Sequence, residues 1–537
     1  MQGLPSQLAR DLSRSAAHPH DPDARAGVEW VQTHISHVFL TRTRVYKLRK
    51  AVDLGFVDFS TRARRNDDCL REVALNRRLA ASVYVGIAPI ERTRGGFRVG
   101  ALEATARRLD AGREHAVVMR RLPAGCDALS MLARGALRPA HLDAVAQRLA
   151  RFHHEHGLGR PSPWPRSAWF ERVQAPARAN LRLLEAGAGR LYPRALWSTL
   201  CEEADAFALA HRDAFEARRS AGRAVDGHGD VHLQHVWFEP GCDEPTLIDC
   251  IEFNDDLRRI DAAAEVAFLV MDLRYRHRAR LAERFLRAYA ACADDFDLYR
   301  VLDYYVSYRA AVRAKVAAIA AEDASIAAAQ RDAAALSVRR HLALAVRALA
   351  PRPPGAVVLM AGTVGTGKST AADVVADALG GVVIASDRIR KRLHGMDAKD
   401  RSGVAAGLYS SAARDRVYAE MLTRAAAVVD SGRVAVLDAT HSRRRQRDAV
   451  LRFAKQGGIP VWIVETRARR ATTLARLARR EARGDSASDA GPARLAASVA
   501  EFQQSAPPRG VRRRIVRTDV AGWKLALRRA ARAWRAR

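Results

Sequence analysis

Apolar and polar positions alternate with two different periods in the first part of the chain. Apolar residues follow a strand-like pattern in Val38–Leu40 and in Arg44–Leu48, which predicts a hairpin around Thr41–Thr43. From Arg62 to Ala80 the apolar residues recur at helical spacing, and Val117–Leu122 again has the character of a strand. Strands that pair around a helix predict an α+β domain.

Helical sequence fills the rest of this half. His141–His156 carries apolar side chains on one face, and Trp164–Ser220 is helical with few glycines. Further helices are expected from Ala262 to Ala350. The first half therefore combines a strand-rich part with a larger helical part, which predicts two lobes joined after Val117–Leu122.

A proline-rich segment then interrupts the helical pattern. Pro351–Gly355 holds three prolines among five residues, which cannot continue a helix. We interpret this segment as a linker and expect one domain at residues 28–350 and a second at 356–537. Residues 1–27 are polar, and we expect them to form a loosely held lead-in.

Short apolar runs in the second domain alternate with helical stretches. The runs are Val357–Met360, Val382–Ala385, Val434–Leu437 and Pro460–Glu465. Buried strands separated by helices predict a parallel sheet in an α/β domain, with its active site at the carboxyl ends of the strands.

The loop after the first of these strands is the most specific motif in the chain. Gly362–Ser369 matches G-x-x-x-x-G-K-[ST] and precedes the helix-forming Ala371–Leu379. Glycines let backbone N–H groups wrap a phosphate, and the helix N-terminus adds a positive dipole. Lys368 would reach the β- and γ-phosphates of ATP, and the Ser369 hydroxyl would bind Mg²⁺. The predicted nucleotide-binding residues are Gly362, Thr363, Val364, Gly365, Thr366, Gly367, Lys368, Ser369 and Thr370.

Acidic and basic residues follow the other strands of this domain. Asp387 and Arg390 follow the second strand as D-x-x-R, and Asp438 follows the third. Further on, a helical run precedes the polar stretch Gly484–Asp489 and carries Arg476, Arg479, Arg480 and Arg483. These arginines are typical of a lid that neutralises a transferring phosphate and excludes water. A solvated helix face explains them equally well.

The first half carries a second set of candidate catalytic residues. Lys47 lies on a predicted strand and Glu72 in the following helix, as in the ion pair with which kinases position phosphates. Asp230 lies in the loop HGDVHLQH, and Asp249 ends the second strand of the hairpin that follows. Two acids in this arrangement can serve a substrate hydroxyl and Mg²⁺ respectively.

Composition narrows the class of protein. Lys and Arg outnumber Asp and Glu by 90 to 59, giving a net charge of +31, which would attract polyanions. The chain has no RG-rich or aromatic-interleaved tract, so nucleic acid is a possible partner but not the favoured one. No apolar run reaches the roughly 18 residues that cross a bilayer. Together with an N-terminus that lacks a signal-peptide centre, this predicts a cytoplasmic protein with no membrane partner. The six cysteines are scattered and are expected to be free thiols.

The motifs of the first half carry a family resemblance. HGDVHLQH and LIDCIEFND, preceded by VYKLRK and LREVALNRRL, resemble the aminoglycoside-phosphotransferase-like branch of the bilobal protein-kinase fold across residues 28–345. The resemblance implies that Lys47 holds the phosphates and Glu72 orients Lys47. It also implies that Asp230 is the catalytic base and that Asp249 chelates Mg²⁺.

The second half resembles the small P-loop kinases that include gluconate, shikimate and polynucleotide 5′-hydroxyl kinases, with a three-layer α/β fold. The D-x-x-R motif looks most like the last group. By this likeness Asp387 accepts the proton of the attacking hydroxyl, Arg390 holds the acceptor, and Asp438 supports the metal through water. The order of the two halves resembles bacterial fusions of an aminoglycoside-phosphotransferase-like domain with a P-loop kinase.

Two departures from the first family affect the expected function. Thr33–Ser36 stands in place of the glycine-rich loop of protein kinases, and His235 stands where the family has an asparagine that binds the metal. We therefore expect an ATP-dependent phosphotransferase, bifunctional, acting on a hydroxyl of a small molecule that the sequence does not specify. The alternatives are a polynucleotide 5′-hydroxyl kinase activity in the second half, or an ATP-dependent switch with a degenerate kinase-like binding domain.

Overall fold

The computed structural model describes residues 4–535 apart from 6, 54, 56, 106–107, 397–409, 484–490 and 503–510. The chain forms two compact units: Met1–Trp164 with Arg219–Asp272, and Pro165–Arg218 with Leu273–Arg537. In the described part of the chain, no helix combines the length and apolar character needed to cross a bilayer. All six cysteines are free thiols, as predicted.

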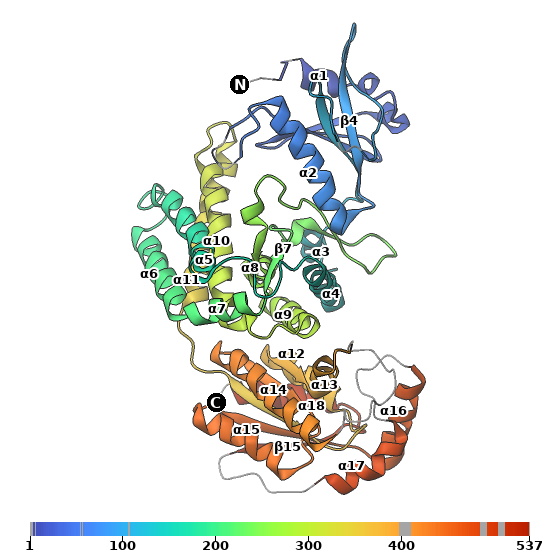
Figure 1. Ribbon diagram of the computed structural model, residues 1–537, viewed down its shortest axis with the longest axis vertical. Helices are drawn as coiled ribbons and strands as arrows, with labels where there is room; N and C mark the ends of the chain where they lie inside the picture. The colour runs from blue at the N-terminus through green and yellow to red at the C-terminus, as the bar shows by residue number, and fades with distance from the viewer. Residues whose placement is uncertain are drawn as a thin grey trace. The chain divides into compact units, whose positions relative to one another are not determined.

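The first unit contains a six-stranded antiparallel sheet, coloured blue in Figure 1. The strand order is β1-β2-β3-β6-β4-β5, with β1 Glu29–Gln32, β2 Ser36–Leu40, β3 Arg44–Arg49, β4 Tyr84–Thr93, β5 Gly96–Val99 and β6 Glu114–Arg120. The predicted hairpin is confirmed, because β2 and β3 pair with Val38 opposite Lys47. Lys47 also lies opposite Val117 of β6, which places it on a central strand.

Helix α2, Arg62–Ala80, spans the residues that the apolar spacing predicted. Thr61 caps it by accepting a hydrogen bond from the Arg64 N–H. Cys69 and Val73 of the helix share an apolar cluster with Val117 of β6, and the helix lies on one face of the sheet (Figure 1). Glu72 is fully buried on this same helix.

The N-terminal segment covers the other face of the sheet, so the expectation of a loosely held lead-in was wrong. Helix α1, Leu8–Leu12, buries its two terminal leucines in the apolar cluster of that face. His18 donates a hydrogen bond to the Leu12 carbonyl at 2.7 Å, and Asp21 accepts one from the Thr41 hydroxyl at 2.8 Å. The polar residues that suggested solvation are therefore used as internal hydrogen-bonding groups.

The remaining α-helices and strands of this unit follow β6 in the sequence. They are α3 Ala128–Ala133, α4 Pro139–Glu155, β7 Ala224–Asp226, β8 Val236–Trp237, β9 Thr246–Leu247, β10 Arg259–Asp261 and most of α8 Ala262–Tyr275. β7 pairs with β10, and β8 pairs with β9. The loop His228–His235 therefore connects two short antiparallel pairs.

The second unit combines helices with a five-stranded parallel sheet (Figure 1). The helices before the linker are α5 Arg166–Glu185, α6 Arg194–Ala210, α7 Arg212–Ser220, α9 Ala279–Ala293, α10 Leu298–Glu322 and α11 Ala328–Leu349. The sheet order is β12-β13-β11-β14-β15, with β11 Ala356–Ala361, β12 Val382–Ala385, β13 Val434–Asp438, β14 Val461–Arg467 and β15 Arg512–Arg517. All four predicted strands are present and parallel.

Seven α-helices accompany this sheet in the described residues after the linker. They are α12 Lys368–Leu379, α13 Ser386–Leu393, α14 Ser411–Asp430, α15 Arg444–Gln456, α16 Arg470–Arg483, α17 Leu495–Glu501 and α18 Trp523–Arg535. Val375 of α12 packs with Val358 of the sheet and Leu527 of α18 in one fully buried cluster. Each such side chain contributes about 1.5–3 kcal/mol, and this packing fixes the start of α12 beneath the phosphate-binding loop.

A buried charge cluster joins the helices of this unit to the sheet. Arg433, just before β13, donates to Asp303 of α10 at 3.1 Å and to Glu283 of α9 at 3.3 Å. Arg274 donates to the same two carboxylates, and Arg352 of the linker lies 3.3 Å from Asp303. These five residues form what we term the Arg433 cluster. The cluster holds both the linker and the start of β13 against α9 and α10.

Helix α13 makes a second set of contacts with α9. Arg388 and Arg392 donate to the carbonyls of Ala291 and Cys292 at 3.4 and 3.0 Å. These carbonyls lie in the last turn of α9, where the helix dipole is negative and attracts cations. The helix that carries the D-x-x-R motif is therefore fixed from behind by α9.

Candidate active sites

Lys47 and Glu72 form the ion pair suggested by the sequence. The Lys47 ammonium donates to Glu72 Oε1 at 2.8 Å and to Asp249 Oδ1 at 3.0 Å. Burial opposes the charge of Lys47, but Asp249 and Glu72 outweigh burial and raise the pKa of Lys47 above its ordinary value. The ammonium therefore stays charged and points between a helix carboxylate and a loop carboxylate.

Arg49 completes this ion-pair network, and sequence reasoning missed it. It lies two residues after Lys47 on the same face of β3 and donates to Asp68 at 2.5 Å, to Glu72 at 2.7 Å and to Glu252. Burial raises the pKa of Glu252 to about 8, although Arg49 opposes that shift. Three carboxylates in this position could hold a cation, and the Arg49 guanidinium fills that role. Side chains two residues apart on a strand lie on the same face of the sheet, so the spacing of Lys47 and Arg49 was the signal that could have identified Arg49.

The loop that carries Asp230 is held from below by Glu265. Its carboxylate accepts the backbone N–H of His228 at 2.7 Å and of Gly229 at 3.1 Å. A Cβ at Gly227 would lie 1.7 Å from the same carboxylate, so only glycine fits there. Glu265 therefore sets the path of the loop, and it was not anticipated from the sequence.

Three histidines surround Asp230. His228 accepts the Asp230 N–H at 3.3 Å, and His232 Nε2 lies 3.6 Å from Asp230 Oδ2. His235 Nδ1 lies 2.9 Å from the Asp230 carbonyl oxygen. Burial raises the pKa of Asp230, but His232 and His235 outweigh it and hold the pKa well below its ordinary value. The carboxylate is therefore ionised and able to accept a hydroxyl proton.

Asp249 lies two residues after β9 in the left-handed backbone region, with φ of 64°. The Tyr84 hydroxyl accepts its N–H at 3.1 Å and fixes this conformation. Lys47 lowers the pKa of Asp249, and its side chain remains 47% exposed. His235 Nε2 lies 3.6 Å from Asp249 Oδ2. The structure thus brings together the predicted Lys47, Glu72 and Asp249, with Asp230 joined to them through His235.

The phosphate-binding loop has the conformation that its glycines permit. Gly362, Gly365 and Gly367 have φ of 136°, 76° and 86°, and a Cβ at Gly362 would lie 2.6 Å from the Thr466 carbonyl. Lys368 Nζ donates to the Thr363 carbonyl at 2.8 Å, folded over the loop. Burial lowers the pKa of Lys368 to about 8. A phosphate would relieve this desolvated charge.

The acids of this half lie beside the loop. Burial raises the pKa of Asp438 to about 6, and a hydrogen bond with Ser369 partly opposes the shift. Asp387 is ion-paired with Arg390 one helical turn later, with side chains 33% and 11% exposed. Asp387 also acts electrostatically on Lys368. The structure therefore places the predicted loop, metal-supporting acid and D-x-x-R motif in one site.

The arginines of α16 are not equivalent. Arg476 donates to the Thr518 hydroxyl and carbonyl, both at 2.8 Å, and the Thr518 hydroxyl donates to the Thr366 carbonyl. Arg476 also lines an open cleft of about 670 Å³ with Thr472, Thr518, Asp519, Trp523 and Arg528. Arg480 acts electrostatically on Lys368, whereas Arg479 is exposed. The side chain of Arg483 and the predicted polar loop 484–489 lie outside the described residues.

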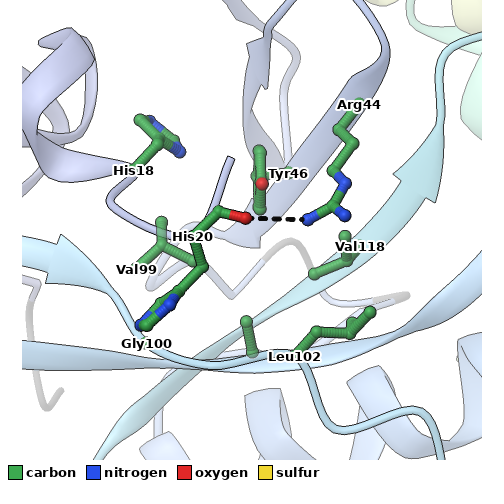
Figure 2. Close-up of a pocket in the computed structure, with 9 residues that line it drawn as sticks. His18, His20, Arg44, Tyr46, Val99, Gly100, Leu102 and Val118 are labelled. Atoms are coloured by element: carbon green, nitrogen blue, oxygen red, sulfur yellow. Dashed lines mark hydrogen bonds between the residues drawn. The ribbon is translucent and has the colours of Figure 1, made fainter. Parts of the chain in front are cut away.

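A small cavity elsewhere in the first unit is separate from these sites (Figure 2). Its volume is about 10 Å³, and it is lined by His18, His20, Arg44, Tyr46, Ala88, Val99, Gly100, Leu102 and Val118. Arg44 closes it by donating to the His20 carbonyl at 3.4 Å. Tyr46 and Lys47 are consecutive strand residues and point to opposite faces of the sheet, so this cavity lies on the face away from Lys47.

Two family models match the chain. The model described as the phosphotransferase enzyme family matches residues 41–305, and the model described as an AAA domain matches residues 357–508. The matched regions lie on either side of the Pro351–Gly355 linker. The first contains Lys47 and Asp230, and the second contains the phosphate-binding loop.

Similar proteins extend across both regions. Uncharacterised proteins of Mycobacterium tuberculosis and Mycobacterium bovis are 34% identical over 443 residues, which is 82% of this chain and 83% of theirs. Among solved structures, a choline/ethanolamine kinase family protein from Mesorhizobium loti is 14% identical, with a TM-score of 0.35, over 62% of this chain and 97% of its own. A gluconokinase from Sinorhizobium meliloti 1021 is 22% identical, with a TM-score of 0.24, over 35% of this chain and 94% of its own.

Proposed function

This chain belongs to the family of two-part proteins in which a phosphotransferase region precedes an AAA domain, and on that premise we propose that it transfers the γ-phosphoryl group of ATP to a hydroxyl of a small molecule, with one active site in each half. The observation that carries the proposal is the arrangement of Lys368, Ser369 and Asp438 around the glycine loop. Positioning and charge neutralisation are the main requirements of phosphoryl transfer, and this arrangement supplies both.

In the second half, the phosphates would lie against the loop Gly362–Thr370 and its helix N-terminus. Lys368 would leave the Thr363 carbonyl and bind the β- and γ-phosphates. Ser369 and Asp438 offer oxygen donors, which suit Mg²⁺. Bound there, Mg²⁺ would neutralise phosphate charge. The cleft beside Arg476 and Trp523 would receive the nucleoside.

The acceptor side of this site is built on α13. Asp387 would accept the proton of the attacking hydroxyl, and Arg390 would move from Asp387 to the acceptor. Arg480 and Arg479 would supply lid charge over the phosphates, with Arg483 beyond them. Arg476 is committed to Thr518, so we assign it to the nucleoside cleft and not to the lid.

In the first half, Lys47 would bind the phosphates and Glu72, braced by Arg49, would hold Lys47 in position. Asp230 would take the proton of the acceptor hydroxyl, because it is ionised and its loop is fixed by Glu265. Asp249 would contribute a carboxylate to the metal.

This mechanism goes with a particular architecture. We propose a bilobal kinase-like domain at residues 28–350, with the two lobes flanking the Lys47 and Asp230 sites, and a three-layer P-loop domain at 356–537. ATP as the donor would place the protein in the cytoplasm.

Two other functions remain as outcomes of testing. The Asp387–Arg390 pair and the net charge of +31 favour a polynucleotide 5′-hydroxyl kinase as the second candidate. His235 in the metal position favours a degenerate first half in an ATP-dependent switch.

The experiment is incubation with γ-labelled ATP and a metabolite extract, followed by identification of the labelled species. Lys368→Ala should remove the products of the second half, and Asp230→Asn those of the first. Labelled phosphate on the ends of nucleic acid would favour the second candidate, as would binding of nucleic acid to the protein that weakens steeply as the salt concentration rises. No labelled product with wild-type protein would refute phosphotransfer to a small molecule.

A further inference from the structure

The metal position of the first half has an unusual set of donor atoms. Asp249 supplies a carboxylate, but its neighbour is the imidazole of His235 at 3.6 Å, with no amide oxygen from that position. Mg²⁺ takes oxygen ligands and keeps several waters. Imidazole suits transition-metal ions such as Zn²⁺ and Fe²⁺. The residues present therefore do not fit a site built for Mg²⁺.

Backbone groups fix the tautomer of each histidine around Asp230. His228 Nε2 donates to a backbone carbonyl at 2.8 Å, so its proton is on Nε2. His232 Nδ1 accepts a backbone N–H at 3.3 Å, which also leaves the proton on Nε2. His235 is reversed, because its Nδ1 lies 2.9 Å from the Asp230 carbonyl and must donate to it. Of these three rings, only His235 in its neutral form presents a free lone pair on Nε2.

That lone pair points to the acid that the kinase-like arrangement assigns to the metal. His235 Nε2 and Asp249 Oδ2 are both acceptors in this tautomer, and their separation of 3.6 Å exceeds hydrogen-bonding distance. If both atoms bound one metal ion, with metal–ligand bonds of about 2.0–2.2 Å each, a separation of 3.6 Å between them would be expected geometry. The two side chains are 16% and 47% exposed, so an ion can reach them.

The anchoring of the ring supports the same conclusion. Metal-binding histidines usually donate their second nitrogen to a carbonyl or carboxylate, which fixes ring orientation and tautomer. His235 makes this contact with the Asp230 carbonyl before any ion is bound. We propose that the first half binds a divalent transition-metal ion of the Zn²⁺ and Fe²⁺ class through His235 Nε2 and Asp249, in preference to Mg²⁺, with Mn²⁺ as the weakest-binding member of the same series.

This inference rests on the proposed function in one respect, namely that a nucleotide enters the first half and its phosphate oxygens complete the coordination. The second half provides an internal contrast, since Ser369 and Asp438 offer only oxygen. One chain would then contain two sites with opposite metal preference.

The test uses the full chain with Mn²⁺ and a non-hydrolysable ATP analogue. Both halves would take up Mn²⁺, but only the first would show nitrogen hyperfine coupling from imidazole in pulsed electron paramagnetic resonance. The coupling should disappear in His235→Asn and in His235→Gln, the second variant guarding against a folding defect in the first. It should persist in His154→Asn, which alters an exposed histidine of α4.

Competition between Mn²⁺ and Mg²⁺ gives a second readout. The preference of the first half for Mn²⁺ should fall by about tenfold or more in His235→Asn, since loss of even an outer-shell partner has an effect of this size. Absent nitrogen coupling in the wild type, or coupling that survives in both His235 variants, would overturn the inference.

The two proposals fail separately. Nitrogen coupling that depends on His235, without any phosphotransfer, would support the metal site and refute the proposed reaction. Phosphotransfer by the first half with Mg²⁺, together with an absence of nitrogen coupling in the Mn²⁺ sample, would support the proposed reaction and refute the metal site.

Discussion

Replacement of Asp303 by alanine is expected to destabilise the second unit strongly. Asp303 accepts from Arg433 at 3.1 Å and Arg274 at 3.2 Å, and the Arg433 and Asp303 side chains are only 5% and 10% exposed. Without Asp303, both arginines keep only Glu283 of the two carboxylates that they share. A buried charge that loses its partner cannot recover its hydration, and removing one member of such a pair typically costs about 3–5 kcal/mol.

A matched control is a nearby ion pair that also involves α10. Arg300 of α10 pairs with Asp430 at the end of α14 at 2.9 Å, but these side chains are 36% and 53% exposed. Asp430→Ala should therefore cost at most about 1 kcal/mol. Urea denaturation followed by far-ultraviolet circular dichroism measures both losses, provided that the slope of each transition is unchanged.

The double variant Asp303→Leu with Arg433→Met separates the effect of an unpaired charge from that of lost packing. Apolar replacements of both partners should recover a large part of the loss, because neither charge is then left unpaired. Equal losses for Asp303→Ala and Asp430→Ala would show that burial does not control the strength of the Arg433 cluster.

Four further predictions concern the second half and the linker before it. Lys368→Ala should weaken nucleotide binding in the second half by about 10–100-fold, since one charge-assisted hydrogen bond is worth about 1.5–3 kcal/mol. Titration calorimetry measures this affinity, with Lys455→Ala, which alters an exposed residue of α15, as the control. An unchanged affinity in Lys368→Ala would contradict the prediction. Because burial raises the pKa of Asp438 to about 6, its ionised form is disfavoured in the folded protein, and turnover should fall as the pH drops through 6. Because the raised pKa means that the Asp438 charge destabilises the folded protein at pH 7, Asp438→Asn should raise the melting temperature at that pH. The same variant should abolish turnover. A lower melting temperature would contradict the upward shift of the pKa. Limited proteolysis should cut the exposed linker near Pro353, yet the two fragments should co-elute through the Arg433 cluster; separation after the first cut would contradict this.

Local patterns predicted much of the fold. The P-loop strand, its helix and three further parallel strands follow from apolar runs and one motif, and α2 follows from helical spacing. The contact between Lys47 and Glu72 could be predicted because a central strand and the helix packed on it bring these residues together. Each of these features depends on residues close in sequence or on one well-defined pairing.

Features that depend on distant partners could not be predicted in this way. The N-terminal segment has few apolar residues, and its burial depends on a sheet formed later in the chain. β15 is rich in arginine, so its place beside β14 is set by pairing and not by hydrophobicity. Glu265 caps a loop more than thirty residues earlier. Arg352 was interpreted as part of a linker because prolines surround it, whereas Asp303 binds it.

The Arg433 cluster has a consequence for how such a chain can be inherited. The carboxylates that Arg433 needs lie on two helices encoded before the linker. A foreign kinase domain grafted after Gly355 would leave Asp303 without its third arginine and Glu283 without its second, unless it carried a basic side chain at the same turn. Recombination at the linker alone would therefore yield hybrid proteins that lack the Arg433 ion pairs. We expect the two halves to be inherited together.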